Sequence, residues 1–375
     1  MRRLKKFAVF FLILIVLACT FSVSAAADES SELSDAEAIF SEIYDAVDVD
    51  TKETIADLGL EEISFESLLT LSPRAVIQEL LDVVRGKLRE PLRALGMILA
   101  FIVLYAVLSG FTQQSGSIHT VYALLATLWI VMLILPSVSK VLAAAFSAIQ
   151  LCADFMLIYI PGFAGIIAMS GKPLTSAAYS SVMVGISNIF SEFQIYALLP
   201  IIQVFFVLNI LNGIESKFSF DSIAAFFKKF IQIALGVFSA VFTGLLAIKG
   251  SLAFSGDSVA VKGVKTLVGS TVPIVGSALG DSLTSILGSI ALIKNTVGFF
   301  GVLVIALINL PVIIDLLLWY LAVAFASAVS GTLGLTQIKK MLDGIGATIS
   351  LVNVLVIFTA FLFTVSTGII LQFRG

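Results

Sequence analysis

Apolar residues dominate this chain from about residue 92 onward, in runs long enough to cross a membrane, since a bilayer core takes about 20 apolar residues in one helix. Two runs are longer than that and are interrupted, one by Glu192 and Pro200 and the other by Pro311 and Asp315. Each is therefore one kinked helix or two short helices. The pattern predicts an all-α, polytopic membrane protein with six to nine spans in residues 91–375. The predicted spans are Leu92–Ser109, Val121–Leu135, Val141–Ile160, Thr175–Asn212, Phe230–Ile248, Val297–Ser330 and Ile345–Leu371.

Residues 1–27 have the pattern of a secretory signal peptide. A basic start precedes the apolar run Phe7–Ala18, and small residues follow it. Cleavage after Ala25 or Ala27 fits this pattern. Two alternatives remain open, namely a lipoprotein-type cleavage that leaves Cys19 lipidated, and an uncleaved anchor.

Residues 28–90 predict a small acidic helical region, which a cleaved or uncleaved signal would place outside the cytoplasm. Ser34 with Glu37 forms a capping box, and Asp50 with Glu53 repeats it for a short second helix. About 60 residues make only a marginal core. We therefore expect the apolar faces of this region to pack on the membrane domain or on a partner. The face of the first helix comprises Ile39, Phe40, Ile43, Tyr44 and Val47.

The basic residues near the first span argue for the opposite orientation. Arg85, Lys87, Arg89 and Arg93 precede this span, whereas Gly110–Thr120 beyond it contains no Lys or Arg. The positive-inside rule alone would place the basic side in the cytoplasm. We give the signal sequence more weight, because it is read first.

A Gly/Pro-rich stretch at about 258–294 does not suit a simple membrane span, so we expect it to bend or to lie in the interface. Its spacing predicts a bend after Pro273 and a helix that Asp281 caps and that runs to Lys294. The functional interpretation is a re-entrant hairpin that lines a polar cavity or a subunit contact, and the alternative is an amphipathic connector on the membrane surface. A faint internal repeat pairs this stretch with Pro161–Gly171. The candidate packing residues are Pro273, Gly276, Gly280, Asp281, Ser285, Gly288 and Ser289.

Three acids lie within apolar runs, namely Asp154, Glu192 and Asp315. Charge at bilayer depth is costly, so such residues point by default into the bundle or into a wet cavity. They are candidates for an ion path or a buried contact, with Lys294 as a possible partner for any of them. The alternative is that each acid lies near the interface or is protonated and hydrogen-bonded.

Composition excludes several other classes of protein. The chain is 59% hydrophobic and only 13% charged, and most of its 25 acidic residues fall between Asp28 and Glu90. This balance does not suggest nucleic-acid binding. His119 is the single histidine, and the sequence has no phosphate-binding loop and no Cys–His pair of a protease. We expect no enzyme activity, no metal site and no cofactor.

The stretch PIVGSALGD at Pro273–Asp281, followed by LGS and IKNTVG within Leu287–Gly298, resembles the stage III sporulation protein AE family. The signal, the short acidic region and the several spans fit the same layout. The chain departs from the family pattern at Ser277 and Gly280, which affects the fine packing of this stretch.

The resemblance implies a multi-pass protein of the mother-cell membrane that surrounds the forespore in an endospore-forming bacterium. It implies membership of a channel or secretion-like complex that supports late forespore development. Implied partners are other stage III sporulation proteins, including an ATPase and ring-forming proteins, and a forespore membrane protein. The resemblance carries over no catalytic residues. Two other functions stay open from the residues alone: an independent secondary transporter that uses the intramembrane acids, and a scaffold without a pore.

Overall fold

The computed structural model describes residues 31–57, 73–112, 116–169, 173–214, 220–242, 244 and 276–372, and the elements in these ranges are helices. The signal sequence, residues 258–275 with Pro273, and residues 58–72 lie outside the described residues. The helices are α2 (Ser31–Asp45), α3 (Val49–Asp57), α5 (Pro73–Thr112), α6 (Gly116–Met169), α7 (Pro173–Glu192), η1 (Phe193–Leu198), α8 (Leu199–Ile214), a helix over Asp221–Phe242, α10 (Gly276–Thr332) and α11 (Thr336–Gln372).

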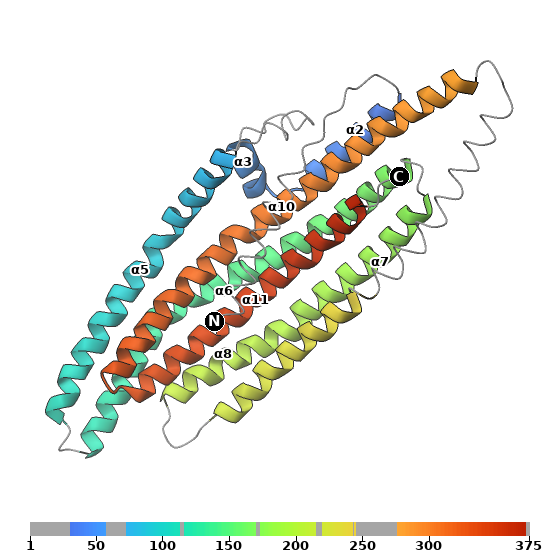
Figure 1. Cartoon of the computed structure of the whole chain (residues 1–375). Coiled ribbons are helices and arrows are strands. Elements are labelled where there is room, and N and C mark those ends of the chain that lie inside the picture. The colour runs from blue at the N-terminus through green and yellow to red at the C-terminus, as the bar shows by residue number, and fades with distance from the viewer. Residues whose placement is uncertain are drawn as a thin grey trace.

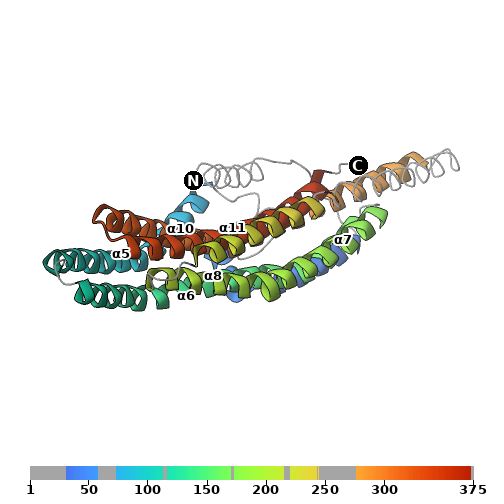
Figure 2. The same cartoon turned by 90° about the horizontal axis from the view of Figure 1, so that it is seen from below.

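The long helices form an elongated antiparallel bundle in two layers (Figure 1 and Figure 2). One layer holds α6, α7 and α8, and the other holds α10, α11 and the helix Asp221–Phe242, with α5 along one edge. Helix α11 is the centre of the bundle. In its most apolar part 72% of the residues are buried, against 22% in α5 and 17% in the helix Asp221–Phe242. The described residues thus contain six helices long and apolar enough to cross a membrane.

Several predicted boundaries between elements are wrong. The runs Val121–Leu135 and Val141–Ile160 belong to one helix, α6, which continues through Pro136 and Pro161. Helix α5 likewise continues from the acidic region through Pro91 into the first span. A proline removes one backbone hydrogen bond and bends a helix, but neighbouring helices in an apolar bundle support the chain on both sides of it.

The long interrupted runs are each one continuous helical path. Thr175–Asn212 is covered by α7, η1 and α8 without a break, and Val297–Ser330 lies within α10. The lower limit of the predicted six to nine spans therefore agrees with the six apolar helices found.

Helix α2 lies along α6 and α10, as the apolar face of the acidic region predicts (Figure 1). The Phe40 ring meets the Phe300 ring edge-on with centroids 5.2 Å apart, and Tyr44 lies 6.2 Å from the same ring. Ile43 is 1% exposed and lies directly over Gly162 of α6. The start of α3 differs from the prediction, because Asp48 and not Asp50 accepts the Thr51 N–H, at 3.1 Å.

Candidate functional site

A buried polar contact joins the two layers of the bundle at η1. The six residues Phe193–Leu198 form a π-helical turn, a wide turn that often occurs at functional positions. It presents Gln194, which is 1% exposed, to Thr359 of α11, which is fully buried. The Gln194 amide donates to the Thr359 hydroxyl at 2.9 Å, and that hydroxyl lies 3.0 Å from the carbonyl of Leu355, to which it can donate.

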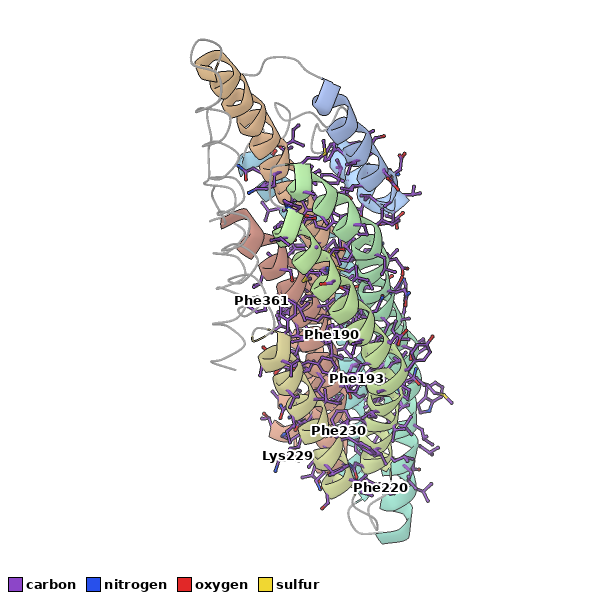
Figure 3. All side chains as sticks on the ribbon, turned by 90° about the vertical axis from the view of Figure 1, so that its right-hand side faces the viewer. Phe190, Phe193, Phe220, Lys229, Phe230 and Phe361 are labelled. Carbon is purple, nitrogen blue, oxygen red and sulfur yellow. The ribbon has the colours of Figure 1, made fainter. Side chains whose placement is uncertain are left out.

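Aromatic rings surround this contact. Phe190 packs edge-on against Phe358 of α11 with centroids 5.2 Å apart, and Phe190 and Phe193 both contact Phe238. Figure 3 shows Phe190 and Phe193 near the middle of the bundle, above Lys229 and Phe230 of the helix Asp221–Phe242. The hydrogen-bonded pair is therefore enclosed by apolar side chains from three helices.

A second polar contact lies at the same height in α10. Asn309 is 23 residues before the end of α10 and Thr359 is 23 residues after the start of α11, so the antiparallel pair brings them level. The Asn309 amide donates to the Ile305 carbonyl at 2.7 Å and lies 3.6 Å from the Cys152 sulfur of α6. Its Oδ1 is buried without a hydrogen-bond partner among the described residues.

We call these four side chains the polar layer: Cys152, Gln194, Asn309 and Thr359. The layer connects α6, η1, α10 and α11, and hydrogen bonds between membrane helices hold such helices in register.

The acid Asp315 belongs to a charged cluster between α5, α6 and α10. Lys87 of α5 lies 3.8 Å from Asp315, and Lys140 of α6 lies 3.5 Å from Glu90 of α5. The Asp315 side chain is 14% exposed, so it lies at the inner edge of the cluster. Lys87 belongs to the basic run before the first span, which argues against the orientation that the signal sequence indicates. In the structure Lys87 balances the charge of Asp315 in α10, so this residue of the run has a structural role.

Asp154 and Glu192 do not join this cluster. Asp154 is exposed on α6, where the Gln150 amide donates to its two carboxylate oxygens at 3.2 and 3.4 Å. Glu192 is exposed at the end of α7. The three acids therefore lie on three different helices, α6, α7 and α10.

Lys294 is 7% exposed within α10. It is 21 residues from Asp315 on the same helix, a separation of about 31 Å at 1.5 Å per residue. The predicted pairing of Lys294 with Asp315 is therefore wrong.

The Gly/Pro-rich stretch is helical where the structure describes it. Gly276, Gly280, Asp281, Ser285, Gly288 and Ser289 all lie in the first turns of α10. Asp281 does not cap a helix, since α10 begins five residues earlier, and the helix does not end at Lys294. A continuous helix satisfies its own backbone groups, which an apolar environment requires. The part of the expected hairpin before Gly276 lies outside the described residues.

The sequence did not lead to the polar layer, because only charged residues within the apolar runs were selected as candidates. Gln194 stands two residues after Glu192 in an apolar run, which is the signal that a search for uncharged polar residues would have used. Among the described residues no three His, Cys, Asp or Glu side chains form a group that would hold a metal ion. The geometry offers contacts between helices and one charged cluster.

Comparison with known proteins gives the family. The family model for stage III sporulation protein AE matches residues 60–373. A curated protein of Bacillus subtilis (strain 168), named stage III sporulation protein AE, is 24% identical over 286 residues, covering 76% of this chain and 71% of the relative. No solved structure matches the chain significantly. With a match across most of its length and six helices able to span a bilayer, the chain is a sporulation membrane protein that belongs to the stage III sporulation protein AE family.

Proposed function

We propose that this protein is an integral membrane component of a multi-protein channel or secretion-like complex that connects mother cell and forespore and that late forespore development requires. The observation that carries the proposal is the family match over residues 60–373. The protein would lie in the mother-cell membrane around the forespore. Residues 28–90 would face the space between the two membranes.

The internal contacts support a structural component over an independent secondary transporter. A transporter that used the three acids would need them at a common site, whereas Asp315 lies in the charged cluster and Asp154 and Glu192 are exposed on α6 and α7 outside it. Asp315 is balanced by Lys87, and the polar layer ties helices together. A bundle held in this way is suited to support neighbouring proteins in the membrane.

The proposed partners are other stage III sporulation proteins. They include a cytoplasmic ATPase, ring-forming membrane proteins and a forespore membrane protein. Within this complex we assign the stretch at 258–294 to close packing at the membrane-embedded base or gate. Gly276 and Gly280 form a small-xxx-small pair, which lets another helix approach closely.

The test is the double substitution Gly276→Leu and Gly280→Leu in an endospore-forming bacterium whose own copy is replaced. We expect heat-resistant spores to fall by several orders of magnitude at normal membrane levels of the protein. Gly236→Leu is the matched control, because a Cβ at Gly236 meets nothing within 4 Å. Normal sporulation of the double variant would reject the packing role.

A second arm separates the three functions. Co-purification with the other stage III proteins, together with no flux by the purified protein in liposomes, is expected of a complex component. Substrate or proton flux by the purified protein alone would replace this proposal with the transporter. Cysteine labelling along Gly276–Ser289 in the intact complex distinguishes a pore from a scaffold, since a scaffold leaves these positions dry.

A further inference from the structure

The tip of the α5–α6 hairpin extends past the neighbouring end of the bundle, where α10 is followed by α11. Helices α5 and α10 run in the same direction and meet at the Lys87–Asp315 ion pair (Figure 1). Lys87 is 25 residues before the end of α5 and Asp315 is 17 residues before the end of α10, so α5 continues about eight residues further. At 1.5 Å per residue this is roughly 12 Å.

The extending tip carries exposed apolar side chains on both sides of the polar residues 112–117, and the end that it passes is charged. Val107 and Leu108 of α5 and Val121 and Tyr122 of α6 are 44–56% exposed. The neighbouring turn between α10 and α11 is followed by charged side chains that are about half exposed, namely Lys339, Lys340 and Asp343.

With the hairpin straight, as it is in the structure, no single position of the bilayer suits both the apolar side chains of the tip and the charged side chains after the α10–α11 turn. A bilayer edge at the tip would bury the charged side chains about 12 Å below the surface. A bilayer edge at the charged residues would leave the apolar tip in water. Most of the helices are also longer than one crossing needs, since the apolar part of α6 has 46 residues and a crossing needs about 20.

Two prolines lie at the base of this hairpin. Pro91 and Pro136 interrupt the hydrogen-bond ladders of α5 and α6. The Glu90–Lys140 pair at 3.5 Å places both prolines at the same height, on the tip side of that pair. The Lys87–Asp315 pair joins α5 to α10, and the Glu90–Lys140 pair joins α5 to α6, both on one side of the prolines. The segment Leu92–Leu135 on the other side is an apolar hairpin whose inner face is buried in the core and whose outer face is exposed.

We propose that the hairpin Leu92–Leu135 pivots about Pro91 and Pro136 relative to the rest of the bundle when the protein is in a bilayer. The pivot brings the apolar tip into the same membrane slab as the apolar parts of α10 and α11. The charged residues at the α10–α11 turn then stay at the surface. The hinge depends on the membrane character of the chain and not on the proposed channel complex.

Distances between spin labels in lipid nanodiscs test the pivot. Labels are placed at Val107 and Leu333, which are 54% and 42% exposed, in the full chain with Cys19→Ser and Cys152→Ser. We expect the label distance to exceed that of the straight arrangement by about 10 Å, on the order of the length of the tip. The variant with Pro91→Ala and Pro136→Ala restores both backbone hydrogen bonds and is expected to give a shorter, narrower distribution.

Two controls make the result specific. Pro311→Ala changes a proline of α10 away from the hinge and is expected to keep the wild-type distribution. A label pair at Val107 and Met132 lies within the hairpin and is expected to keep one distance in every variant. Identical Val107–Leu333 distributions in the wild type and the Pro91/Pro136 variant would overturn the hinge.

Discussion

Single side chains decide how the two layers of this bundle meet. Gln194 and Thr359 are uncharged and lie at the centre, whereas the exposed acids Asp154 and Glu192 lie outside. A buried amide must find a partner or lose the free energy of an unmade hydrogen bond. The polar layer therefore fixes the register of η1 against α11 more specifically than apolar packing alone would.

The Gln194–Thr359 hydrogen bond is measurable by a double-mutant cycle. We expect Gln194→Leu and Thr359→Val each to lower the free energy of unfolding in detergent, with a coupling of about 1 kcal/mol between them. A coupling of zero would show that the two side chains do not act together. Asn188→Leu serves as a control, because Asn188 is exposed on α7.

A close backbone approach at Gly344 is the second residue-scale determinant. A Cβ at this position would overlap the side chain of Asn209 in α8. We expect Gly344→Ala to lower the free energy of unfolding by about 1–3 kcal/mol, the usual cost of overpacking. Gly236→Ala has open space around it and should leave stability equal or slightly higher, because alanine favours helix. Equal melting temperatures of the two variants would contradict the close approach.

At the scale of elements, helix α2 depends on the membrane bundle for its packing. Its buried side chains contact α6 and α10, and α2 with α3 is too small to hold a core without them. The acidic region is therefore an attached part of the bundle, and its position follows that of α6 and α10.

Substitution at Gly162 tests this attachment. A Cβ there would lie 2.8 Å from the Cδ1 of Ile43, so Gly162→Leu is expected to displace α2. Faster amide hydrogen exchange over residues 39–47, with unchanged exchange in α11, is the expected result. Gly185→Leu on α7 has nothing within 4 Å and is the control. Unchanged exchange in α2 after Gly162→Leu would show that α2 is held in another way.

At the scale of the whole molecule, the part of the chain that the structure describes has an even number of long apolar helices. Helix α5 starts at the end of the bundle where α11 finishes (Figure 1), and the described residues from α5 to α11 form six apolar helices. Both ends of residues 73–372 therefore lie on the same side of the membrane if each helix crosses once.

Reporter fusions test this topology. With residues 28–90 outside the cytoplasm, we expect a cytoplasmic reporter to be active after Thr112, Ile214 and Leu333. An extracytoplasmic reporter should be active after Met169, Phe242 and Gln372. The opposite pattern at every junction would show that the protein has the opposite orientation, with Arg85–Arg93 in the cytoplasm as the positive-inside rule indicates. A mixed pattern would change the number of crossings.

The sequence by itself determined the class of protein and the family. Long apolar runs require helices in a bilayer, because each helix satisfies its own backbone groups, and this rule acts on local composition. The sequence also predicted the apolar face of α2, and the motif from Pro273 to Gly298 indicated the family. Both are patterns within one segment of the chain.

Only the tertiary structure decided which residues meet. The partner of Asp315 is Lys87, more than 200 residues away, and the partner of Gln194 is Thr359, 165 residues away. The continuity of α6 through Pro136 and of α10 through its first glycines also came from the fold. A proline or glycine only weakens a helix locally, and the packing of neighbouring helices determines whether the helix ends there.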